Sequence, residues 1–200
     1  MDPQNPYAPT PLTPESKGFF SNLGTHLIDF IQTLVVFGAI FALIYLFVAQ
    51  PHKVSGKSMF PTFEDGDYIL TDKITYRLNT PKRGDVVVLK NPRDKSQDFI
   101  KRVIVLPEET VKVEGGSIYI DNQKLIEPYI SEEVKTDAGN FLTEGLEVKA
   151  GPNQYFVMGD NRPHSSDSRE WGPITKEEIV GKAFFRYWPP QTFGLTNSHP

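Results

Sequence analysis

Two hydrophobic patterns divide this chain of 200 residues. From Phe30 to Pro51 no charged residue occurs, and apolar side chains would cover every face of a helix formed by this stretch. A helix of ~20 residues crosses the ~30 Å hydrocarbon layer of a bilayer. We therefore predict a single transmembrane helix over residues 26–50, ended by Pro51. The alternatives are a buried helix of a soluble protein and a cleavable secretory signal, which fits poorly because a long polar stretch precedes the apolar run.

The segments at the two ends of the chain differ from the rest in composition. Residues 1–25 contain five prolines among polar residues, and this composition predicts a flexible tail. Residues 191–200 are predicted to form a C-terminal tail. Basic residues flank the apolar stretch on both sides, with Lys17 before it and Lys53 after it, so the charge pattern does not orient the helix in a membrane.

After Pro51 the hydrophobic pattern changes to an alternation of period two. The segments that follow it are short, rich in Val, Ile and Tyr, and separated by turns of Gly, Pro, Asn and Asp. A helical turn is expected only at 175–180. The pattern predicts a mainly β, compact, barrel-like domain over residues 51–190 and excludes a doubly wound α/β fold. The predicted strands are 67–74, 84–91, 99–106, 110–115, 117–122, 153–160 and 181–188.

Composition narrows the function classes. The net charge of -4 gives no basic footprint for nucleic acid, so no nucleic-acid partner is expected. The absence of cysteine excludes disulfides, thiolate catalysis and the common zinc ligand sets. The histidines are dispersed and none has a metal-binding spacing, so we expect neither a metal nor another cofactor. The four histidines are His26, His52, His164 and His199.

A serine directly after the apolar stretch is a candidate nucleophile. Gly56, Lys57 and Ser58 suggest a phosphate-binding loop, but the first glycine of that motif would fall at Pro51, which excludes it. A Ser-x-x-Lys motif is excluded because Pro61 stands three residues after Ser58. A turn between a glycine and a proline can expose a hydroxyl and leave its own N–H free for an oxyanion. An ordinary loop serine is the alternative, and in local sequence it is the more common one.

A serine nucleophile needs a base, and lysine is the candidate here. His52 lies too near Ser58 in the chain, and His164 has no matched acid. A lysine serves if its pKa falls from ~10.4 to ~8, where roughly a tenth is neutral at pH 7. Lys101 stands in a predicted strand, and its neighbour Arg102 points to the opposite face. The alternation therefore predicts that one of the two is buried without saying which.

A polar segment at residues 159–169 supplies further candidate groups. The alternative interpretation is an ordinary polar turn, because Gly, Asn, Asp and Pro are all dense here. Within the segment, Asp167 and Arg169 can form an ion pair. A serine can also hydrogen-bond a neutral lysine amine and orient it.

Four segments together resemble the bacterial type I signal peptidases, a serine-lysine protease family. The resemblance covers the apolar stretch and nearly all of the chain from Val54 to Trp188. The order and spacing of the segments make it specific. They are SGKSMFPT (55–62), RGDVVVLK (83–90), FIKRVIVLP (99–107) and GDNRPHSSDSR (159–169).

The resemblance implies a catalytic role for three residues. Ser58 would be the nucleophile, Lys101 the general base, and Ser165 the hydroxyl that orients Lys101. Some members of the family carry a serine where this chain has Gly56, so the oxyanion hole would rely on backbone N–H groups of Gly56 and chiefly Ser58. The residues implied to support the site are Arg102 paired with Asp160, Asp167 paired with Arg169, and Gly159, whose backbone would pack closely against it.

The resemblance also implies how a peptide would bind. It would lie as an added strand between residues 54–56 and residues 98–100, with small pockets that select Ala-like side chains. The candidate substrate-binding residues are Val54, Met59, Asp98 and Ile100. Because the chain between Lys101 and Gly159 is short, the large second β-domain of some family members should be reduced here to a small hairpin cap near residues 114–130.

The implied function is that of a plasma-membrane endopeptidase with its N-terminus in the cytoplasm and its catalytic domain on the outer face. Its partners would be the lipid bilayer and the signal peptides of exported preproteins, cleaved through an acyl-enzyme. One alternative is a self-cleaving serine-lysine regulator, against which the apolar stretch and the lack of a DNA-binding helical domain argue. The other is a catalytically silent, membrane-tethered β-domain that binds peptides, which would lack the nucleophile or the base.

Overall fold

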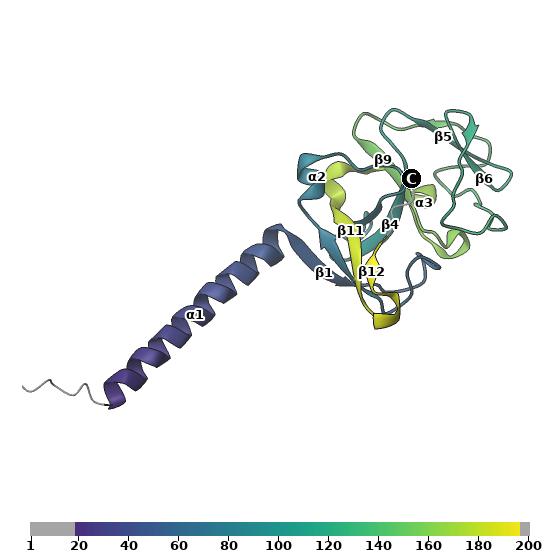
Figure 1. Cartoon of the computed structure of the whole chain (residues 1–200). Helices are drawn as coiled ribbons and strands as arrows, with labels where there is room; N and C mark the ends of the chain where they lie inside the picture. The colour runs from purple at the N-terminus through teal and green to yellow at the C-terminus, as the bar shows by residue number, and fades with distance from the viewer. Residues whose placement is uncertain (1–18, 197–200) are drawn as a thin grey trace, which may run out of the picture. The chain divides into compact units, whose positions relative to one another are not determined.

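The computed structural model describes residues 19–196, with side chains described from residue 24 onward. The chain forms two units that divide between Leu43 and Ile44. Most of the first unit is the helix α1 (Phe19–Phe47), and the second unit is built mainly of β-strands (Figure 1). The predicted fold class, a mainly β domain after one N-terminal apolar helix, is confirmed. Most of the tail predicted over 1–25 lies outside the described residues, but its last part, from Phe19, belongs to α1.

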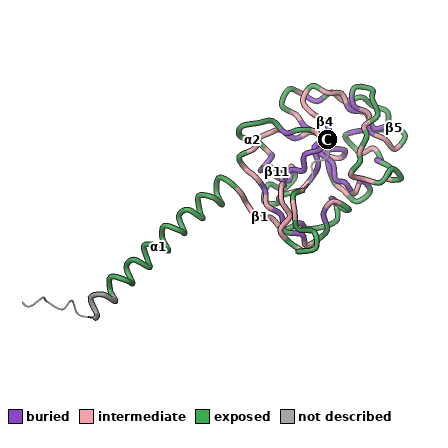
Figure 2. The backbone as a smooth tube through the Cα atoms, viewed as in Figure 1, coloured by how far each residue is buried: buried purple, intermediate pink, exposed green. Residues whose placement is uncertain are grey.

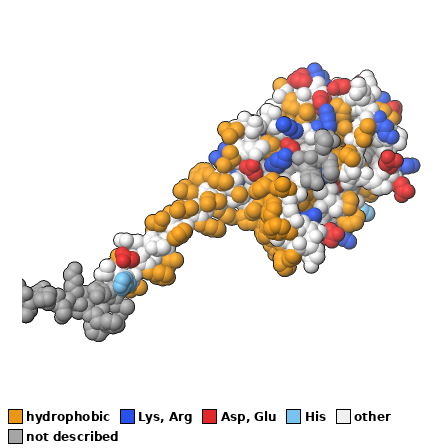
Figure 3. Space-filling view, in the orientation of Figure 1, with side chains coloured by type: hydrophobic (Ala, Val, Ile, Leu, Met, Phe, Trp, Pro, Cys, Tyr) orange, Lys and Arg blue, Asp and Glu red, His pale blue; other side chains and the backbone are white. Residues whose placement is uncertain are grey.

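The segment Gly24–Phe47 of α1 is long and apolar enough to cross a membrane. Its side chains are exposed, and most of them are hydrophobic, with a charged side chain only near its start (Figure 3). The prediction that the helix extends to residue 50 is wrong, because β1 (Ala49–Lys53) begins directly after it. Pro51 lies within this strand and pairs with Leu70. A proline is tolerated there because β1 is an edge strand, where one N–H is not needed by a neighbour.

An eight-stranded antiparallel sheet forms the body of the second unit, in the order β1-β2-β11-β3-β4-β9-β10, with β12 paired to β11. All seven predicted strands are present, five of them here, with bounds within two residues of the prediction. The tail predicted over 191–200 is partly wrong, because β12 folds back onto Phe185 and Arg186. The remaining bounds are β2 (Tyr68–Asp72), β3 (Val86–Lys90), β4 (Asp98–Val105), β9 (Gln154–Met158), β10 (Ile174–Thr175), β11 (Ile179–Trp188) and β12 (Gly194–Leu195).

Irregularities in the strands bend this sheet into a curl (Figure 1). The register of β11 shifts where it pairs with β2 and again where it pairs with β3, and β4 shifts between Val103 and Val105. Such bulges increase twist and bend the bulged strand. Gly181 lies at one of them, and a Cβ there would stand 2.3 Å from the Asp72 carbonyl oxygen. The absence of a side chain thus permits the close approach of β11 to β2.

A second, four-stranded sheet in the order β7-β6-β5-β8 replaces the small hairpin cap predicted near 114–130. It begins earlier than predicted and recruits residues far beyond 130, because β8 pairs with β5. Its inner face packs Val111 and Ile118 against Ile104 and Phe156 of the large sheet. The bounds are β5 (Thr110–Glu114), β6 (Ser117–Ile120), β7 (Gln123–Lys124) and β8 (Val148–Lys149).

Two further apolar clusters lie on either face of the central strand β3. All four residues from Val86 to Leu89 are buried, which explains why this strand reads as a continuous apolar run. Figure 2 shows that buried positions gather inside the β-domain, whereas the described part of α1 is exposed. One cluster includes Val87 and the other Val88, which packs with Val54 under the loop that carries Ser58. The short helices are α2 (Thr75–Leu78), α3 (Ser168–Trp171), η1 (Arg162–His164), η2 (Lys176–Glu178) and η3 (Pro190–Thr192).

Candidate active site

The loop between β1 and β2 holds Ser58 outside regular structure. At its base, the Val54 N–H donates to the Asp67 carbonyl at 2.8 Å. Gly56 has a φ of 89°, a left-handed conformation that favours glycine. Its N–H donates to Asp65 Oδ1 at 2.8 Å and is therefore already engaged. Of the two N–H groups expected at an oxyanion hole, only that of Ser58 has no partner among the described residues.

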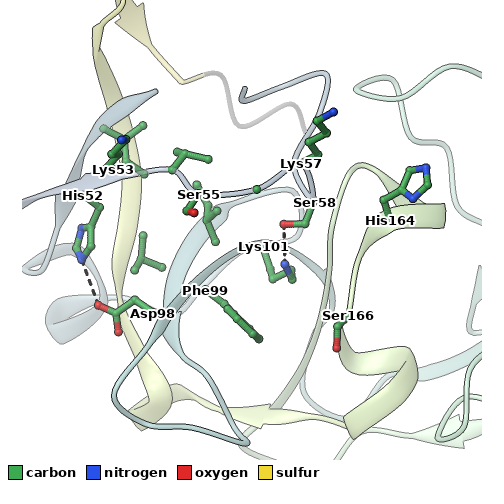
Figure 4. A pocket seen from close by; sticks show the side chains of 15 residues that line it. His52, Lys53, Ser55, Lys57, Ser58, Asp98, Phe99, Lys101, His164 and Ser166 are labelled. Atoms are coloured by element: carbon green, nitrogen blue, oxygen red, sulfur yellow. Dashed lines mark hydrogen bonds and ion pairs between the residues drawn. The ribbon is translucent and has the colours of Figure 1, made fainter. Parts of the chain in front are cut away.

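Ser58 and Lys101 are in direct contact (Figure 4). Their Oγ and Nζ atoms are hydrogen-bonded at 2.8 Å, and Lys101 is only 3% exposed. Burial lowers the pKa of Lys101 to about 8, against the opposing charges of Asp167 and Asp160 and with some help from Arg169. About a tenth of the amine is therefore neutral at pH 7, which is the state that a general base requires.

The expectation that only one of Lys101 and Arg102 is buried is wrong, since both are. They do lie on opposite faces of β4, but each face is covered. The Arg102 guanidinium donates to Asp160 at 2.8 and 2.6 Å and to the Gly84 carbonyl at 2.8 Å. The ring of Tyr129 stacks over it with a centroid distance of 3.9 Å. The arginine is thus paired on its edge and covered on its face, which is how a buried cation is accommodated.

Thr62 connects this ion pair to the loop of the candidate nucleophile. Its hydroxyl donates to Asp160 Oδ2 at 2.5 Å and accepts from Arg102 Nη2 at 3.2 Å. Sequence reasoning assigned no role to Thr62, although it stands in the segment 55–62 that carries the resemblance. A single threonine in a loop belongs to no hydrophobic pattern, so its contacts with Asp160 and Arg102 can be recognised only from the three-dimensional structure.

The segment 159–161 packs directly beneath Ser58. The Asn161 N–H donates to the Ser58 carbonyl at 3.0 Å, and the Asn161 amide side chain donates to the Lys57 carbonyl at 2.9 Å. A Cβ on Gly159 would lie 2.4 Å from the Ser58 carbonyl oxygen and 2.3 Å from Ser165 Oγ. Gly159 therefore packs closely against the site, whereas the role of Asn161 was not anticipated.

Replacing Gly159 with alanine should reduce activity about 100-fold. The added methyl group has no free space, so the Ser58 carbonyl must move, and a shift of ~1 Å at a reacting group costs about that factor. Overpacking should also lower the free energy of unfolding by roughly 1–3 kcal/mol. Gly38→Ala is the matched control because nothing lies within 4 Å of a Cβ there. A Gly159→Ala protein that is as active as the wild type would show that the close packing does not matter for the reaction.

The expected Asp167–Arg169 pair is present, but the expected contact of Ser165 is not. Arg169 donates to both carboxylate oxygens of Asp167, at 2.8 and 2.9 Å, and the Gly159 N–H donates to the same carboxylate at 3.1 Å. Ser165 Oγ is buried and has no hydrogen-bond partner in the described part of the chain. It therefore makes no hydrogen bond with Lys101 in this state.

A cleft of about 320 Å³ runs past the Ser58–Lys101 pair (Figure 4). Three of the four residues predicted to bind substrate, Val54, Asp98 and Ile100, line it, and their role stays a prediction. Met59 does not line it, because it is 1% exposed in the apolar cluster below. Within residues 24–196, no cluster of three or more His, Asp or Glu side chains is placed to hold a metal ion.

His52 connects the two rims of this cleft away from Ser58. Its Nε2 atom lies 3.4 Å from Asp98 Oδ2, and Lys90 approaches the same carboxylate at 2.7 Å. The pKa of His52 is lowered by burial, although Asp98 opposes the shift. Sequence reasoning considered His52 only as a general base for Ser58, and its pairing with a residue 46 positions away has no local signature.

Comparisons with known proteins identify the family of the chain. The family described as "Signal peptidase, peptidase S26" matches residues 27–188. A "Probable signal peptidase I-1" of Synechocystis sp. is 38% identical over 175 residues, covering 84% of this chain and 86% of that protein. "Signal peptidase IB" of Staphylococcus aureus is 34% identical over 178 residues, covering 84% and 92%. A crystal structure of a signal peptidase I from Enterococcus faecalis is 29% identical, with a TM-score of 0.44, covering 52% of this chain and 97% of that one.

Proposed function

The chain belongs to the signal peptidase family, peptidase S26, as a serine endopeptidase, and we propose that it removes signal peptides from exported preproteins through a Ser58–Lys101 dyad. The observation that carries this proposal is the 2.8 Å contact between the Ser58 hydroxyl and a buried lysine whose pKa is about 8. A lysine with an unshifted pKa would be almost wholly protonated at neutral pH and could not accept a proton.

In the proposed mechanism the neutral Lys101 amine removes the Ser58 proton as Oγ attacks the scissile carbonyl carbon. The tetrahedral intermediate collapses, the C–N bond breaks, and the Lys101 ammonium returns its proton to the departing amine. The remaining acyl-enzyme is an ester on Ser58. Lys101 then deprotonates a water molecule that attacks this ester and releases the signal peptide.

Charge that develops on the carbonyl oxygen requires an N–H donor. We assign this role to the Ser58 N–H and withdraw it from Gly56, because Asp65 already occupies the N–H of Gly56. The role of Ser165 stays a prediction. Its buried, unpaired hydroxyl packs on Gly159 beside Ser58 and could accept one of the three N–H bonds of the Lys101 ammonium after proton transfer.

The peptide would bind in the cleft as a strand between residues 54–56 and 98–100. Ser55, Gly56 and residues 98–100 are exposed or half-buried at the cleft, which suits β-augmentation, whereas the backbone of Val54 is already bonded to the Asp67 carbonyl and the Gly66 N–H. Val54, Ile69, Val88 and Ile100 give this cleft an apolar lining next to Ser58. A shallow apolar lining favours small side chains such as alanine before the scissile bond.

The helix α1 would hold this domain on the outer face of the plasma membrane, with the N-terminus in the cytoplasm. The length and composition of Gly24–Phe47 support a membrane span. Tethering confines the enzyme to the surface where signal peptides emerge and raises their effective concentration.

The pH dependence of cleavage tests the proposed dyad. Because only neutral Lys101 can act, kcat/KM for a preprotein should rise as pH increases and reach half of its plateau near pH 8, with about a tenfold fall for each pH unit below that. The assay uses the full chain in detergent from pH 5.5 to 10. His52→Gln is the control, since it removes a histidine that lines the cleft. A limb near pH 6 that His52→Gln abolishes would assign the base to histidine and overturn the dyad.

A further inference from the structure

A cavity of about 290 Å³ lies on the β-domain beside the residue where α1 ends. The helix α2 forms one wall, and two contacts join residues of this region to residues 47 and 48. The Lys73 N–H donates to the Val48 carbonyl at 2.9 Å, and the Arg77 guanidinium lies 5.7 Å from the centre of the Phe47 ring. The residues that line the cavity are Lys73, Tyr76, Arg77, Lys176, Glu177, Ile179 and Val180.

Three cations line this cavity, and in the described part of the chain none of them is within 4 Å of a carboxylate, although the charge of Lys176 acts on Glu177 at longer range. Among the described residues, Lys73 Nζ donates to the neutral Gln50 side chain at 3.2 Å, and Arg77 stacks on an aromatic ring. No ion pair involves Lys176 in that part of the chain. By contrast, the neighbouring Lys182 is paired with Asp85 at 2.6 Å.

The nearby carboxylates do not neutralise this charge. Asp72 is occupied by the N-terminus of α2, where it accepts from the Ile74 and Thr75 N–H groups at 2.7 and 3.0 Å. Glu177 lines the cavity, but it accepts two bonds from the Asn153 amide. Three cations against one carboxylate leave the cavity positive, on a chain whose net charge is -4.

Apolar side chains surround the cations on the same element. Leu78 is 79% exposed and Ile74 is 37% exposed, both on or next to α2. Cations and exposed apolar residues together, adjacent to a helix that can span a bilayer, are typical of a surface that lies at the level of lipid headgroups.

We propose that this cavity binds the phosphate of an anionic phospholipid headgroup, with Lys73, Arg77 and Lys176 as its cationic ligands. The inference rests on the proposed membrane anchoring of α1, because the helix end at Phe47 then marks the edge of the hydrocarbon layer. A lipid bound here would fix the orientation of the β-domain on the membrane surface. Each Lys or Arg near an anionic surface contributes roughly a fivefold increase in affinity.

Lipid binding by the full-length Ser58→Ala protein in neutral detergent tests the proposal. Phosphatidylglycerol and phosphatidylcholine are titrated separately and the adducts counted by native mass spectrometry. We expect phosphatidylglycerol to bind at least about tenfold more tightly. The triple variant Lys73→Gln, Arg77→Gln, Lys176→Gln should lose this preference. The matched control carries the same charge change at three exposed cations elsewhere, Arg93→Gln, Lys124→Gln and Lys135→Gln, and should retain it.

Each other outcome overturns the proposal. Equal binding of the two lipids, or an equal loss in both triple variants, would mean that the cavity is not a specific site. Inorganic phosphate at 10 mM (about the upper physiological level) is added in a separate arm, and complete displacement of the lipid by it would indicate a free-phosphate site instead. The Ser58→Ala background separates this result from catalysis. A wild-type protein that fails to cleave preproteins would contradict the proposed function but would leave the proposed lipid binding unaffected.

Discussion

Replacing Lys101 with methionine should abolish proteolysis while making the folded protein more stable at neutral pH. The amine is the only group within hydrogen-bond distance of Ser58 Oγ among the described residues, so its loss leaves the hydroxyl without a base. The expected fall in kcat is about 10⁴-fold to 10⁶-fold, the range measured when one member of a catalytic unit is removed. Ser58→Ala should cost as much, and the double variant no more than either, because the two residues act as a unit.

The stability effect follows from the direction of the pKa shift. Lys101 has a folded-state pKa of about 8 against an ordinary value of 10.5, so below pH 8 folding buries a charge that water solvates better. Between pH 8 and 10.5 the unfolded chain binds more protons than the folded one, and stability rises with pH across that window. At 1.36 kcal/mol for each pKa unit, the penalty at pH 7 is about 3 kcal/mol. Methionine fills a similar volume without the charge and should recover part of it.

Thermal or chemical unfolding of the wild type, Lys101→Met and Ser58→Ala in the same detergent measures this effect. Ser58→Ala is the control that removes activity and keeps the lysine. An inactive Lys101→Met protein that is less stable than wild type at pH 7 would mean that its inactivity reflects misfolding. A Lys101→Met protein that keeps more than a few per cent of the activity would exclude the lysine as the base.

The sequence predicted the strands well because alternation follows directly from one buried face. It failed at Ala49–Lys53, where the edge strand contains Pro51 and begins two residues after α1 ends, with no charged residue between them. The small sheet was also underestimated, since β8 pairs with β5 across a long loop that has no periodic pattern. The alternation of residues within a segment therefore predicts that the segment is a strand. It does not predict which distant strand that segment pairs with, because the pairing depends on the whole fold.

At the site, the resemblance to a known family predicted the roles of Ser58 and Lys101. The local sequence pattern alone did not predict them. Alternation could not reveal that Lys101 and Arg102 are both buried, because that requires knowing what covers each face of β4. Thr62 was missed for a related reason, since a loop hydroxyl gains its role from a carboxylate 98 residues away. The expected hydrogen bond of Ser165 was wrong for the structure as it stands, because the hydroxyl is close to Ser58 but has no partner.

Replacing Arg102 alone should destabilise the domain strongly, because it breaks the fully buried Arg102–Asp160 pair. Both side chains have zero exposure, so Arg102→Met leaves a carboxylate buried without its cation, at a cost of about 3–5 kcal/mol. Replacing both residues, as Arg102→Met with Asp160→Asn, removes the unpaired charge and should cost less than Arg102→Met alone. The exposed Lys149–Glu108 pair is the matched control, and Lys149→Met should cost no more than about 1 kcal/mol.

The Arg102–Asp160 pair also acts on Lys101, the proposed base, because the charge of Asp160 raises its pKa. A variant of Asp160 can therefore separate a purely structural role of the pair from a positioning role. Asp160 raises the pKa of Lys101, so Asp160→Asn should move the acidic limb of the pH–rate profile below pH 8. Thr62 bonds to both members of the pair, so the loop of Ser58 should also lose its attachment, and kcat should fall more than KM rises. A variant that unfolds more easily but keeps the wild-type pH profile and kcat would show that the pair only supports the fold. A shifted limb in a protein that remains folded would show that the buried carboxylate sets the protonation of the base.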